Sequence, residues 1–162
     1  MFTELHPRYT KLKKGVSDFA SKYDQFVREH RSFDEQLHAF SSWLRMMRDD
    51  LAQQSEVVGD LKVLQERKSA VEELEELRCG EAAKFELIAE LGERLYSHTS
   101  PDGKEVLRKQ VMRMRGDWDR LTEDIRDSIQ CTRKRLENFH QFYHENQTPN
   151  RLQISWFFVT TF

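Results

Sequence analysis

An unbroken apolar spacing of three and four residues runs through the first 51 residues and constrains the fold more than any other feature. Fifteen positions follow it, and fourteen of them are apolar. They are Phe2, Leu5, Tyr9, Leu12, Val16, Phe19, Tyr23, Phe26, His30, Phe33, Leu37, Phe40, Leu44, Met47 and Leu51. A period of 3.5 residues puts them on one face of one helix, as in a helix that packs against partners in a supercoiled bundle. Such a helix, with Pro7 in its first turn, is longer than a single compact domain needs.

Two further helices are expected. The second begins near Asp60, a candidate N-cap, and the acidic run 72–76 gives it a charged outer face. The third follows Ser100, Pro101 and Asp102, which offer a capping serine, a proline suited to the first helical position and an early acid. The sequence therefore predicts an all-α fold, a left-handed antiparallel three-helix bundle with a long continuous N-terminal helix.

The apolar faces of the three helices predict the core. Tryptophans at heptad positions are more often core residues than platforms for a ligand, so Trp43 and Trp118 are interpreted as structural. The predicted core consists of Trp43, Trp118, Phe40, Met47, Leu64, Val71, Ile88, Val111, Met114, Leu121 and Ile125.

Composition agrees with long helices and excludes several classes of partner. The chain has only three prolines and six glycines in 162 residues, while 11% aromatic residues separate it from disordered polyelectrolytes. A net charge of −2 predicts no bulk attraction to nucleic acid. No apolar run is long enough for a transmembrane segment, and the first residues do not resemble a signal peptide, so a cytoplasmic location is expected.

The sequence offers no catalytic chemistry. It lacks a glycine-rich phosphate loop, HExxH, CxxC, GxSxG and an EF-hand loop, so we expect no enzyme activity, no cofactor and no catalytic or cofactor-binding residue. His140 and His144 are spaced i, i+4, but two histidines alone make a weak metal site and none is expected. If the second and third helices reverse near residue 100, Cys79 and Cys131 lie too far apart for a disulfide, so free thiols are expected.

An internal repeat suggests how the chain is divided. A shift of 116 residues places Trp118 on Phe2 and Phe142 on Phe26, with coincident heptad phases. Residues 1–32 are then the C-terminal part of a third helix of a preceding unit, and 33–145 form a complete unit with helices at about 33–54, 60–97 and 101–145. Residues 146–162 form an apolar tail outside the repeat. The leading interpretation of this tail is an alternative or truncated terminus; the second is a tail folded on the bundle, and the third is a hook for a membrane surface or partner.

A three-helix unit with Trp43 in its first helix, Trp118 in its third and a helical junction to its neighbour resembles the spectrin repeat. The resemblance covers about residues 33–144 and includes Gly59-Asp60-Leu61. The stretch from Gly92 through Thr99-Ser100-Pro101-Asp102-Gly103 to Trp118-Asp119 is most similar to the nesprins, the nuclear-envelope spectrin-repeat proteins, although spectraplakins and dystrophin-like rods are also similar.

The resemblance implies a non-enzymatic rod segment that acts as spacer, scaffold and tension-bearing linker of a cytoskeletal protein. It implies adjacent spectrin repeats and cytoskeletal proteins such as actin as partners, and a location at the cytoskeleton or, through a parent protein, at the outer nuclear membrane. An alternative is a helical-bundle binding module for a signalling protein or membrane surface. His30 is interpreted as a junction residue whose titration softens the packing between units.

Overall fold

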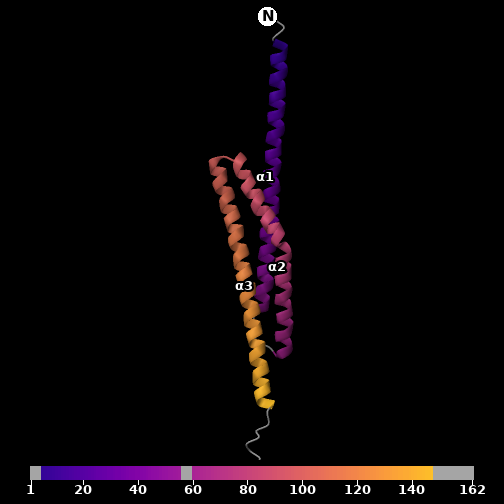
Figure 1. Cartoon of the computed structure of the whole chain (residues 1–162), viewed down its shortest axis with the longest axis vertical. Helices are drawn as coiled ribbons and strands as arrows, with labels where there is room; N and C mark the ends of the chain where they lie inside the picture. Colours follow the sequence, from indigo (N-terminus) through magenta and orange to yellow (C-terminus); the bar gives the residue numbers. More distant parts are fainter. Residues whose placement is uncertain (1–4, 56–59, 148–162) are drawn as a thin grey trace, which may run out of the picture. The chain divides into compact units, whose positions relative to one another are not determined.

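The computed structural model describes residues 5–55 and 60–147, and their side chains except at 55 and 145–147. Within these ranges the chain forms three helices, α1 (Leu5–Ser55), α2 (Leu61–Leu95) and α3 (Pro101–Gln147), with a short 3-10 turn at Tyr96–His98 and no strand (Figure 1). The prediction of an all-α three-helix bundle is confirmed. The predicted apolar tail, 146–162, lies outside the described residues apart from the backbone of 146 and 147.

Side-chain groups at the helix starts explain why α2 and α3 begin where they do. The backbone N–H of Val63 donates to Asp60 Oδ1 at 3.0 Å, so Asp60 is the predicted N-cap. At the start of α3, Gly103 N–H donates to Ser100 Oγ at 3.3 Å, and Pro101 is the first helical residue. Both start signals in the sequence are confirmed.

The chain divides into two compact units, each with a part of all three helices. Unit 1 contains residues 1–46 and 80–120, and unit 2 contains 47–79 and 121–162. In unit 1, Phe85 on α2 stacks on Trp118 of α3. Gly92 lies about two helical turns nearer the connection between the helices and adjoins Val111 of α3. The contacts therefore run antiparallel between α2 and α3.

The core of unit 1 is aromatic at its centre. Trp118 is 8% exposed, and its ring lies 4.8 Å from that of Phe85 with an angle of 8° between the planes. Phe40 is fully buried, with its ring 5.9 Å from Trp118, and Trp43 lies 6.3 Å from Trp118 but is only half-buried. We call Phe40, Trp43, Phe85 and Trp118 the aromatic cluster.

Aliphatic side chains make up most of the remaining core. Of the predicted core residues, Trp43 is half-buried and the others are buried. In unit 1 the buried ones are Phe40, Ile88, Val111, Met114 and Trp118; in unit 2 they are Met47, Leu64, Val71, Leu121 and Ile125.

Candidate functional site: the open seam and the turn clasp

The first part of α1 exposes the same apolar seam that its later part buries. Phe33, Leu37, Phe40 and Leu44 are between 0 and 9% exposed. The seam residues from Leu5 to Tyr23 are 60–72% exposed, and α1 extends in Figure 1 beyond the connection between α2 and α3. These residues, which we call the open seam, are Leu5, Tyr9, Leu12, Val16, Phe19 and Tyr23.

The phase of the seam does not change where its covering ends. The spacing of three and four residues continues from Leu5 through Phe33 to Leu44, and α1 runs through this region without a break. A contiguous exposed apolar stripe of this kind marks an interaction surface in a folded protein. The open seam is therefore the candidate functional site.

The open seam ends at a clasp between α1 and the turn that connects α2 to α3. The His98 ring stacks on Phe26 with 4.1 Å between ring centroids and 18° between their planes. One turn further along α1, His30 Nε2 lies 3.0 Å from Thr99 Oγ1. We call Phe26, His30, His98 and Thr99 the turn clasp, which holds α1 to the end of unit 1 upstream of Phe33.

The hydrogen bonds of Thr99 indicate which nitrogen of the His30 ring donates in this contact. Thr99 Oγ1 donates its single proton to the carbonyl oxygen of Leu95 at 2.6 Å. Oγ1 must then accept a hydrogen bond from His30, which assigns the proton to Nε2. The predicted effect of His30 on the packing between units stays a prediction.

Two glycines give the clasp and the adjoining core the close approach that they need. A Cβ at Gly103 would stand 2.5 Å from Thr99 Cγ2, and one at Gly92 would stand 2.7 Å from Val111 Cγ2 and 2.9 Å from Phe33 Cε2. Both glycines, with Thr99, belong to the stretch that carries the nesprin resemblance. The structure gives these residues a packing role, which the sequence pattern had not assigned.

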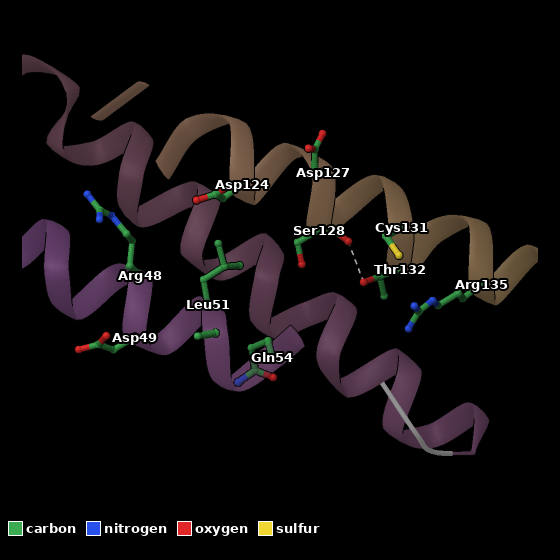
Figure 2. A pocket seen from close by; sticks show the side chains of 11 residues that line it. Arg48, Asp49, Leu51, Gln54, Asp124, Asp127, Ser128, Cys131, Thr132 and Arg135 are labelled. Carbon is green, nitrogen blue, oxygen red and sulfur yellow. Dashed lines mark hydrogen bonds between the residues drawn. The ribbon is translucent and has the colours of Figure 1, made fainter. Parts of the chain in front are cut away.

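Unit 2 contains an open groove of about 610 Å³, lined mainly by polar residues whose apolar parts make up more of its surface than their polar atoms do. Figure 2 shows Arg48, Asp49 and Leu51 on α1 and Ser128 and Thr132 among the residues on α3. Thr132 Oγ1 donates to the carbonyl oxygen of Ser128 at 2.8 Å. Thr132 therefore satisfies its hydroxyl within its own helix, where the predicted apolar face of the third helix weakens.

Within the described residues, a shifted pKa is resolved for the two partners of an ion pair on α2. Arg78 donates to both carboxylate oxygens of Glu75, with Nη2···Oε1 at 2.7 Å and Nε···Oε2 at 2.8 Å. This hydrogen bonding lowers the pKa of Glu75, against a smaller opposing effect of burial, and the attraction of Arg78 and Arg126 lowers it further. The pair holds two neighbouring turns of α2 together and adjoins no cluster of catalytic groups.

The cysteines and histidines do not form a metal site in the part of the chain that is described. No group of three or more His, Cys, Asp or Glu side chains is placed to hold a metal ion within residues 5–55 and 60–147. Cys79 and Cys131 are both free and exposed, as expected. No described helix is long and apolar enough to span a membrane.

Comparison with known proteins shows that the chain is similar to a segment of a very large protein. The chain is 35% identical over 140 residues to Muscle-specific protein 300 kDa of Drosophila melanogaster. The alignment covers 86% of this chain but only 1% of that protein, so the chain corresponds to a small segment of it. No protein-family model matches the chain. The similarity and the three-helix fold are compatible with a spectrin-like repeat and with a structural helical segment of a large protein.

Proposed function

We propose that the chain is a non-enzymatic segment of a spectrin-repeat rod, serving as spacer, scaffold and tension-bearing linker. The observation that carries this proposal is the unbroken phase of the seam from the buried part of α1 into the open seam. One helix that contributes the same face to two successive bundles transmits orientation from one to the next. The turn clasp adds a second attachment of α1 to unit 1 at the point where one bundle would succeed the other.

The proposal assigns the chain to repeats as the sequence suggested. Residues 1–32 complete the third helix of a preceding repeat, 33–145 form a full repeat, and 146–162 lie outside the pattern. Adjacent repeats are then the first partners, because the open seam needs further helices to cover it. The exposure of six large apolar side chains supports this division.

The finer part of the proposal concerns the parent protein. We propose a nesprin-type protein that links the outer nuclear membrane to actin, on the strength of the stretch from Gly92 to Trp118. The relative is named for muscle, a load-bearing tissue, which agrees with a mechanical role. Co-sedimentation with filamentous actin tests whether this segment contributes to binding or only spans a distance; a pure spacer remains in the supernatant.

Stretching single molecules of the whole chain between its ends tests the mechanical role. Residues 33–145 should unfold cooperatively and release about 40 nm of chain, at roughly 3.3–3.6 Å per residue. Trp118→Ala should lower the unfolding force, whereas Leu87→Ala, at a 61% exposed position on α2, should leave it unchanged. A gradual extension without a discrete event would contradict a tension-bearing role.

The second candidate is a binding module for a signalling protein or a membrane surface. It is favoured by the exposed apolar side chains of the open seam, with basic residues Arg8, Lys13 and Lys22 beside them. Co-sedimentation with vesicles at physiological salt discriminates the two roles. A spacer stays in the supernatant, while a membrane module pellets with anionic vesicles and loses this binding when Leu12 and Phe19 are changed to glutamate.

A further inference from the structure

The charges beside the open seam carry information about what covers it. The residues that flank a heptad seam are the ones at the two ends of each four-residue gap between apolar positions, and their charges select the partner. Along the open seam, from Leu5 to Tyr23, these positions are His6, Arg8, Lys13, Gly15, Ala20 and Lys22. Three are basic and none is acidic, and all three basic side chains are exposed. We call Arg8, Lys13 and Lys22 the basic flank.

We propose that the open seam binds a helical hairpin with acidic side chains beside its own apolar seam. This rests on the proposed role of the open seam as an interface. Two helices are required because the same seam, from Phe33 to Leu44, is buried in unit 1 against both α2 and α3: Phe40 contacts Phe85 and Trp118. Acidic residues opposite the basic flank complement its charge and exclude partners of the wrong sign.

A second copy of the chain does not meet this requirement. If two open seams paired antiparallel about Gly15, Arg8 would face Lys22 and Lys13 would lie near Lys13 of the other copy. If they paired parallel, Arg8 would face Lys13 across the interface. Both arrangements put like charges together beside the apolar contact, which is destabilising. The basic flank therefore disfavours self-association through the open seam, although the apolar side chains of the open seam would favour it.

A membrane surface also fits the open seam less well than helices do. Helices that lie on membranes present a wide apolar face, whereas a strict alternation of three and four residues gives the narrow stripe of a bundle seam. Lys13 and Lys22 stand directly at the edges of this stripe, and Asp18 and Asp24 lie on the same stretch of helix. The narrow stripe favours a helical partner.

Gly15 provides a second sign of a close partner. It stands beside the seam in the interior of α1, where glycine lowers helix stability relative to alanine. No atom lies within 4 Å of the place where its Cβ would stand, and a shallow hollow of about 600 Å³ opens there beside Leu12, Val16 and Phe19. The hollow leaves room for a side chain or backbone of the hairpin, so Gly15→Leu should weaken hairpin binding although it favours the helix.

The test compares two synthetic helical hairpins with the same apolar seam. One carries glutamate and the other lysine at the positions beside the seam, and each is titrated with the whole chain by fluorescence anisotropy. The glutamate hairpin should bind about tenfold or more tightly at low salt. This preference should shrink at about 1 M salt, where charges are screened within about 3 Å.

Charge reversal of the chain supplies the matched control. Arg8→Glu, Lys13→Glu and Lys22→Glu together should invert the preference in favour of the lysine hairpin. Lys14→Glu, Arg28→Glu and Arg31→Glu make the same change in net charge at exposed positions that belong neither to the basic flank nor to the hollow beside Gly15, and should leave the glutamate hairpin preferred.

The outcomes separate this inference from the function on which it rests. Equal binding of the two hairpins would overturn the acidic partner but keep the open seam as an interface. Binding of neither would remove the proposed role of the open seam as well. A dimer of the chain that blocks binding of the glutamate hairpin would overturn the inference in favour of a second copy. Binding to anionic vesicles but to neither hairpin would overturn it in favour of a membrane surface.

Discussion

Truncation of Trp118 to alanine removes the centre of the aromatic cluster. The side chain is 92% buried, since only 8% remains exposed, and it contacts Phe40, Trp43 and Phe85. A buried tryptophan removes about 150–250 Å² from water, which at about 25 cal/mol per Å² corresponds to roughly 4–6 kcal/mol as an upper bound. With partial collapse of the cavity, we expect a loss of about 3–5 kcal/mol in the free energy of unfolding.

Chemical denaturation followed by circular dichroism measures this loss, and the thermal midpoint should fall by about 6–20 °C. Leu87→Ala is the control, because Leu87 is 61% exposed on α2 and its truncation should change the free energy by less than about 0.5 kcal/mol. If Trp118→Ala cost no more than Leu87→Ala, with an unchanged denaturant slope, the three-helix core of unit 1 would be refuted.

Three further changes test local features. Gly92→Ala should destabilise the chain by about 1–3 kcal/mol through the clash of its methyl group, whereas Gly80→Ala, in open space, should stabilise it by up to about 1 kcal/mol; thermal melting of both variants decides. The lowered pKa of Glu75 beside Arg78 contributes stability that is fully present above the pKa of an unfolded glutamate, about 4.3, and is lost as the pH falls through the lower folded value. Glu75→Gln should remove about 0.5 kcal/mol of this pH-dependent stability. The control Glu76→Gln should leave the contribution of Glu75 in place, and denaturation of both variants at several pH values measures the difference. Thiol labelling without reductant should count both cysteines in the native and the unfolded chain, and a lower count in the unfolded chain would indicate a disulfide.

The helices and their starts were predictable because their causes are local. Asp60 caps α2 through a bond to a residue three positions away, and Ser100 does the same for α3. The continuity of α1 follows from a seam that never changes phase between Leu5 and Leu51. Such features depend on neighbours within one or two turns, which the sequence displays directly.

The turn clasp could not be predicted, because its partners are distant in the sequence. His30 and Thr99 are separated by 69 positions, and nothing in either local pattern indicates their hydrogen bond. The need for glycine at 92 likewise arises from side chains of two other helices. The signal available in the sequence was the resemblance of this stretch to nesprin repeats, which gave no physical reason for its residues.

The two tryptophans illustrate the same division. Both lie on or beside an apolar seam, yet Trp118 is buried and Trp43 remains half-buried, because burial depends on what faces each ring from the other helices. The sequence by itself determined the helical period, the caps and the single apolar face of α1. Only the tertiary structure decided which part of that face is covered, since two further helices bury the seam from Phe33 onward and leave the seam residues from Leu5 to Tyr23 exposed.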